Sequence, residues 1–121
     1  MDLQELCSIQ HDFDKRHGWA VDAVPPEGRL EVLERETIGL TGEVGELANL
    51  VKKARLRVGR NSTAEEAFGQ VVSDASEELT DALIYLIRLF QLLGADIEEN
   101  YTRKLRANAA RYREYERGES L

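Results

Sequence analysis

The segment RLEVLERETIGLTGEVGELANLVKKARLRV, residues 29–58, repeats a set of mostly apolar side chains every three or four positions: Leu33, Thr37, Leu40, Val44, Leu47, Val51 and Ala54. That alternation is typical of an α-helix packed along a bundle seam. A second long helix is predicted over residues 63–93, with its seam at Val72, Ala75, Leu79, Ala82, Leu86, Leu89 and Leu93. We therefore predict an all-α fold organised around two long central helices.

Two shorter helices are predicted on either side of this pair. The first covers residues 2–17 and opens with the capping pattern Asp2-x-x-Glu5, and Pro25-Pro26 marks the loop that follows. The last covers residues 96–115, after a helix stop at Gly94. The expected architecture is a four-helix bundle-like single domain over residues 1–121, with a frayed tail at 117–121.

The length of the central helices predicts an assembly of several copies. Each is about 30 residues long in a chain of 121 residues. One short domain offers too little surface to cover such long apolar seams, so we expect a homodimer or a homotetramer to complete the fold.

Composition and charge narrow the possible partners. The apolar runs are far shorter than the ~20 residues of a membrane span, and no basic-then-apolar leader opens the sequence, so no membrane partner is expected. The single Cys7 fits a reducing compartment and predicts a cytoplasmic location. A net charge of −7 argues against binding a nucleic-acid polymer, whereas a basic run over residues 101–117 favours a compact anionic ligand.

Four carboxylates form two pairs inside the long helices. Glu43 and Glu46 are three residues apart in one helix, as are Glu78 and Asp81 in the other. Residues at that spacing project from one helix face, where like charges repel. Hard oxygen ligands in this number suit Mg²⁺, with Mn²⁺ as a possible substitute. The pattern predicts a magnesium site between the two helices, at which one of these acids or a neighbour accepts a proton from water.

The chain also resembles a known family. Glu43-Val44-Gly45-Glu46-Leu47, Glu78-Leu79-Thr80-Asp81 and the run Lys104-x-x-x-Asn108-x-x-x-Tyr112 are similar to motifs of the MazG-like all-α nucleoside triphosphate pyrophosphohydrolases, which include the dCTP pyrophosphatases and the dimeric dUTPases. The resemblance spans about residues 30–112, although the separation of the two acidic motifs exceeds the usual family spacing.

This resemblance implies a Mg²⁺-dependent hydrolysis of a nucleoside triphosphate to its monophosphate and pyrophosphate, as house-cleaning of the nucleotide pool. It implies that Glu43, Glu46, Glu78 and Asp81 are the catalytic metal ligands. It further implies phosphate contacts from Lys104 and Asn108, with Tyr112 one turn beyond them.

Three more residues are candidates for substrate contact, each with a structural alternative. Trp19 and Phe13 supply flat apolar surfaces on which a base can stack. Packing in the core is the favoured alternative for Phe13, and for Trp19 the two roles are equally supported. Lys53 lies two turns beyond Glu46 and is either a second phosphate contact or an exposed lysine.

Two rival functions follow from the same pattern. A di-iron bundle needs Glu-x-x-His motifs on two helices, and the only similar sequence is Asp14-x-x-His17, away from the acid pairs. The stronger rival is a non-catalytic helical interaction module that kept the MazG-like fold. Such a module would keep its fold on losing the acids.

Overall fold

The computed structural model describes residues 1–118, which form four α-helices and three short 3₁₀ turns. In chain order they are α1 (Leu3–Arg16), η1 (Val21–Ala23), η2 (Pro26–Gly28), α2 (Arg29–Arg57), α3 (Ala64–Leu93), α4 (Ile97–Arg111) and η3 (Arg113–Tyr115). The predicted all-α class is confirmed, and no strand forms within residues 1–118. Of the tail predicted to fray, residues 119–121 lie outside the described residues.

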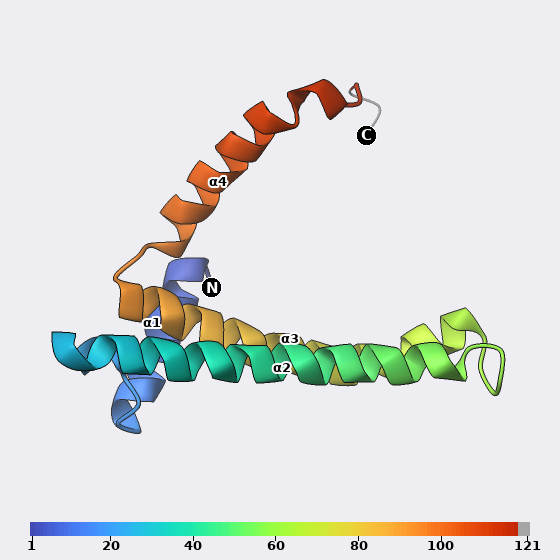
Figure 1. Ribbon diagram of the computed structural model, residues 1–121, viewed down its shortest axis with the longest axis horizontal. Helices are drawn as coiled ribbons and strands as arrows, with labels where there is room; N and C mark the ends of the chain where they lie inside the picture. The colour runs from blue at the N-terminus through green and yellow to red at the C-terminus, as the bar shows by residue number, and fades with distance from the viewer. Residues whose placement is uncertain (119–121) are drawn as a thin grey trace.

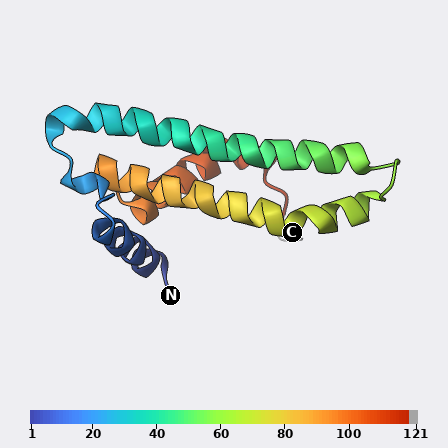
Figure 2. The ribbon, with the colours of Figure 1, turned by 90° about the horizontal axis from the view of Figure 1, so that it is seen from below.

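The helices α2 and α3 form a long antiparallel hairpin that dominates the molecule (Figure 1). Small and branched side chains are buried along it, namely Val32 and Ala54 on α2 and Ala67, Ala82 and Ile87 on α3. Seen from below, α1 lies beside the C-terminal half of α3 (Figure 2), and η1 buries Val21 against α3. The core is therefore narrow and follows the hairpin axis.

The fourth helix departs from the prediction. After the left-handed Gly94 that ends α3, α4 projects away from the hairpin instead of packing along it (Figure 1). Tyr101 and Leu105 on α4 remain 67% and 54% exposed. A four-helix bundle is thus not closed within one chain, because three residues after α3 turn the chain outward before α4 begins.

Capping residues set the helix ends. Asp2 with Glu5 forms the predicted capping box, and Thr63 with Glu66 forms a second one at the start of α3. The last helix is shorter than expected: α4 ends at Arg111 and a separate 3₁₀ turn follows. None of the helices within residues 1–118 has the length and apolar character that a bilayer crossing requires.

Gly39 is the one glycine of α2 at which a neighbouring side chain leaves no room for a Cβ. A Cβ added there would fall well inside contact distance of the Tyr85 ring on α3, whereas Gly42 and Gly45 face open space. Within the chain, close packing therefore accounts for glycine at position 39 only. The Tyr85 ring seats over the Gly39 backbone and fixes the register of the hairpin at this point.

Alanine substitutions at two of these glycines are expected to act in opposite directions. Gly42→Ala adds helix propensity in open space and should stabilise the protein by about 0.5–1 kcal/mol. Gly39→Ala forces the Tyr85 ring aside, a cost of about 1–3 kcal/mol that outweighs the same gain. Urea unfolding of both variants measures this difference, and equal stabilisation of the two would contradict the seating of Tyr85.

Candidate functional site

Three carboxylates from the two long helices meet at one point of the hairpin. Glu43 and Glu46 come from α2 and Glu78 from α3, and one oxygen of each lies within 4.8 Å of the others. The two glutamates of α2 share a helix face because they are three residues apart. The antiparallel path of α3 then brings Glu78 to that face. The predicted juxtaposition of the two acidic motifs is confirmed for these three residues, which we call the carboxylate cluster.

The cluster lacks donors for its oxygens. Among residues 1–118, the Oε2 atoms of Glu43 and Glu78 are buried and have no hydrogen-bond partner. A buried carboxylate oxygen without a donor is costly, and three acids within this distance repel one another. A divalent cation with hard-oxygen preference, such as Mg²⁺ or Mn²⁺, fits this donor set because it compensates both the charge and the missing contacts.

The crowding also changes the acidity of Glu78. When it is protonated, Glu78 can donate its O–H to the carboxyls of Glu46 and Glu43, and this hydrogen bonding raises the pKa of Glu78 to about 7; burial and the two neighbouring charges act in the same direction. Without a cation, the cluster therefore retains a proton near neutral pH. A cation must displace that proton in order to bind.

Metal binding at the cluster is expected to tighten as pH rises. The pKa of Glu78 is raised from 4.5 to about 7 on folding, so its proton stabilises the metal-free fold at low pH, and that contribution is lost as pH rises through about 7. The increase in melting temperature on adding Mg²⁺ should accordingly be larger at pH 8 than at pH 6. Differential scanning fluorimetry with Mg²⁺ or EDTA measures it, and an equal shift at both pH values would count against competition between proton and metal.

The other predicted ligand, Asp81, and the predicted phosphate contact Lys53 do not belong to the carboxylate cluster. Asp81 is exposed one turn further along α3 and does not belong to the group of three. Lys53 is exposed on α2, seven residues after Glu46 and hence on nearly the same helix face. Asp81 remains a predicted ligand, and Lys53 remains a predicted phosphate contact.

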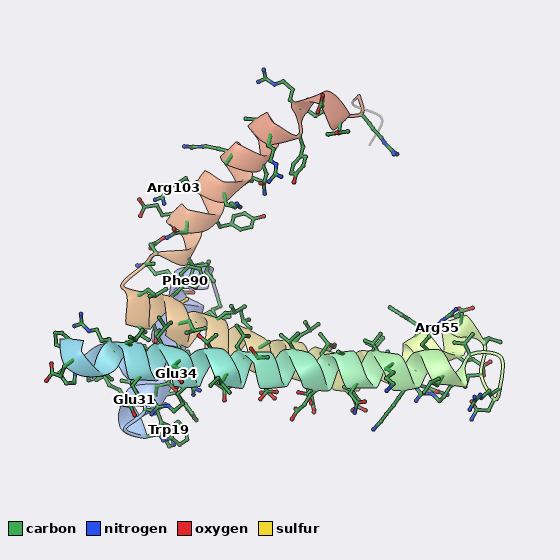
Figure 3. All side chains as sticks on the ribbon, viewed as in Figure 1. Trp19, Glu31, Glu34, Arg55, Phe90 and Arg103 are labelled. Atoms are coloured by element: carbon green, nitrogen blue, oxygen red, sulfur yellow. The ribbon has the colours of Figure 1, made fainter. Side chains whose placement is uncertain are left out.

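The structure does not bring the predicted phosphate contacts of the last helix to the cluster within one chain. Lys104 and Asn108 lie on α4, and Tyr112 caps its end. Figure 3 shows α4, marked by Arg103, and Trp19 on opposite sides of the hairpin. The ring of Tyr112 packs instead under the Arg111 guanidinium, 5.1 Å from its centroid. These three residues can serve a site only if α4 meets another copy of the chain.

The predicted base contacts form an aromatic group at the end of α1. The His17 ring stacks on Trp19 with centroids 4.9 Å apart, and Phe13 packs on His17 at 4.3 Å. Phe13 is 41% exposed and Trp19 is 55% exposed, so the core role favoured for Phe13 is wrong. Phe13 supports the aromatic group from its outer side.

A buried ion pair that the sequence analysis missed anchors this region. Asp14 is fully buried and accepts two hydrogen bonds from Arg88, at 2.9 Å from Nε and 2.8 Å from Nη2. Gln10 donates a third, at 3.0 Å. The pair joins α1 to α3 across 74 positions of sequence. The one available signal was Arg88 itself, a single charge inside the apolar run LIYLIRLF at residues 83–90.

A pocket opens next to this ion pair. It has a volume of about 360 Å³ and is lined by Gly18, Trp19, Ala20, Val21, Val24, Arg35, Glu36 and Arg88. The Arg88 guanidinium lies between two rings, 6.0 Å from the centroid of Trp19 and 5.9 Å from that of Tyr85. We call this space the Trp19 pocket.

Comparison of the chain with protein-family models, with curated proteins and with solved structures gave no significant match.

Proposed function

We propose that the protein is a Mg²⁺-dependent nucleoside triphosphate pyrophosphohydrolase of the MazG-like all-α type. The observation that carries the proposal is the carboxylate cluster, in which three acids from α2 and α3 converge within 4.8 Å and two buried oxygens lack donors. The motifs around these acids resemble those of that family, and the product pair would be a nucleoside monophosphate and pyrophosphate.

The chemistry of the reaction explains why acids would be gathered at a site for an anion. A bound divalent cation reverses the local charge and stabilises the negative charge that develops on phosphoryl oxygens. The carboxylates of this chain would hold that cation through Glu43, Glu46 and Glu78, with Asp81 completing the set. One of these acids, or a carboxylate beside them, would accept the proton of the attacking water.

Cationic side chains near the carboxylate cluster would contact the phosphate groups of the substrate. Lys53 is two helical turns from Glu46, a rise of about 10 Å along α2. An ammonium at this distance can contact the terminal phosphate while the reacting phosphate lies at the carboxylates. The basic residues of α4 from a second copy of the chain would supply further phosphate contacts.

A second copy would also cover the apolar face that the hairpin leaves exposed. Phe68, Val72, Leu79, Leu83 and Leu86 follow one another at helical spacing on α3, and each is at least 41% exposed. A stripe of this length is typical of a subunit interface. We infer a homodimer or homotetramer in which α4 of one copy reaches the hairpin of another, and sedimentation velocity should accordingly detect no monomer at micromolar concentration.

The proposed reaction is tested by a pyrophosphate-specific coupled assay with a panel of canonical and modified triphosphates. Pyrophosphate is expected from at least one of them with Mg²⁺ and from none with EDTA. Absence of turnover together with an unchanged melting temperature in millimolar Mg²⁺ would contradict the proposal. That result would instead favour the non-catalytic helical interaction module, to which the exposed stripe on α3 is equally suited.

A further inference from the structure

The Trp19 pocket contains a carboxylate that lacks hydrogen-bond donors. Glu36 lines the pocket from α2, and its side chain is only 12% exposed. Its Oε2 is buried and has no hydrogen-bond partner among residues 1–118, while Oε1 lies 3.7 Å from the exposed Arg35. Rotation about the terminal bond of a glutamate is easy, so either oxygen can turn to a group that enters the pocket. The Oε2 atom of Glu36 is thus a hydrogen-bond acceptor in the pocket to which no described residue donates.

Arg88 also lines this pocket, and its side chain is held in place by Asp14. Asp14 holds its Nε and Nη2, which leaves Nη1 outside that bidentate pair. The guanidinium cannot swing to Glu36 without breaking two charge-assisted bonds to a buried partner. The pocket is therefore lined by an acceptor, Glu36, by a cation held in place, Arg88, and by the half-exposed Trp19.

Glu36 and the carboxylate cluster lie on nearly the same face of α2. Glu36 precedes Glu43 by seven residues on α2, which places the two side chains on nearly the same face and about 10 Å apart along the axis. On α3, Tyr85 follows Glu78 by the same seven residues and lies over Gly39, between the two sites. A ligand lying along the hairpin can reach both the pocket and the cluster.

We propose that Glu36 determines which base the protein accepts, by taking a hydrogen bond from the exocyclic amino group of a base bound in the Trp19 pocket. This inference rests on the proposed function for the triphosphate part of the ligand, but the pocket itself binds the base. It selects cytosine and adenine over uracil and hypoxanthine.

The chemistry of a carboxylate accounts for this choice. An ionised carboxylate only accepts hydrogen bonds, so it pairs with an amino group. Uracil and hypoxanthine present a carbonyl oxygen at the same position, which would set two acceptors against each other at the buried Oε2 of Glu36. Sites built around one such hydrogen bond discriminate strongly between otherwise matched ligands. Trp19 lines the pocket and offers apolar contact to any base, so it contributes affinity without selecting between bases.

Matched substrate pairs test the proposal. CTP and UTP, and ATP and ITP, differ by an amino group against a carbonyl and by the adjacent ring nitrogen, which accepts a hydrogen bond in cytosine and adenine and carries an N–H in uracil and hypoxanthine. The wild-type kcat/KM should favour the amino member of each pair by at least about tenfold, and Glu36→Gln should reduce that preference to within about threefold because an amide can both donate and accept. Glu34→Gln, an exposed acid about 200° around α2 from Glu36, is the matched control and should keep the preference.

A binding measurement separates this inference from the proposed reaction. Trp19 is the one tryptophan of the chain, so quenching of its fluorescence by CMP, UMP, AMP and IMP in EDTA reports the pocket without metal or turnover. Stronger quenching by CMP than by UMP and by AMP than by IMP, lost in Glu36→Gln, supports the proposal even if no triphosphate is hydrolysed. Equal quenching within both pairs, or hydrolysis of both pairs at equal kcat/KM, overturns it while leaving the proposed reaction standing.

Discussion

Replacement of Glu78 by glutamine is expected to lower triphosphate turnover by about a hundredfold or more while raising the stability of the metal-free protein. The substitution keeps the size of the side chain and removes one of the proposed anionic ligands, so the proposed cation would be held less tightly. It also removes a charge from a cluster in which Glu46 and Glu43 already raise the pKa of Glu78 to about 7. Turnover and the melting temperature in EDTA should therefore move in opposite directions.

These opposite signs distinguish a metal ligand from a residue that only supports the fold. A structural role would lower the melting temperature and the activity together. The increase in melting temperature on adding Mg²⁺ should also disappear in Glu78→Gln and persist in Glu34→Gln, the exposed acid on α2. Normal turnover by Glu78→Gln would remove this residue from the assigned ligands.

Replacement of Asp14 by alanine is expected to destabilise the protein by about 3 kcal/mol, the largest effect on folding among these substitutions. Removal of one partner of a buried ion pair leaves the other charge desolvated and unpaired, a cost of about 3–5 kcal/mol. We place Asp14 at the lower end because the Arg88 side chain is 16% exposed and retains some access to water. The bond from Gln10 is lost with it.

Urea unfolding monitored by circular dichroism measures this effect. Asp12→Ala is the matched control, because Asp12 is an exposed carboxylate on the same helix and its removal should change stability by less than about 0.5 kcal/mol. The release of Arg88 should also disorganise the Trp19 pocket, so nucleotide quenching of Trp19 should weaken in Asp14→Ala. Similar stabilities of the two variants would contradict the anchoring role of the Asp14–Arg88 pair.

Local chemistry in the sequence was enough to predict the long helices and the meeting of their acids. The pattern Thr63-x-x-Glu66 and the stop at Gly94 delimit α3 because capping depends only on neighbouring residues. The three-residue spacing of Glu43 and Glu46 fixes them to one face whatever the tertiary structure. The meeting of Glu78 with that face followed from the expectation that the two longest amphipathic helices pack together.

Contacts between distant residues were beyond the sequence pattern. Nothing near Asp14 indicates that it pairs with Arg88. The two residues are 74 positions apart in the sequence, and their pairing depends on how α1 crosses α3. Gly39 looks like Gly42 and Gly45 in sequence, and only the position of the Tyr85 ring distinguishes it. The direction of α4 depends on the backbone after Gly94, and its exposed face would be completed by another chain.

The most direct test of the proposed reaction at the carboxylate cluster is ³¹P NMR of the wild-type protein with a nucleoside triphosphate, in Mg²⁺ and again in EDTA. We expect the three triphosphate resonances to be replaced by those of the monophosphate and pyrophosphate in Mg²⁺ and to persist in EDTA. Orthophosphate with a diphosphate would contradict the assigned cleavage position. Unchanged triphosphate spectra across the panel of canonical and modified bases would contradict the proposed function.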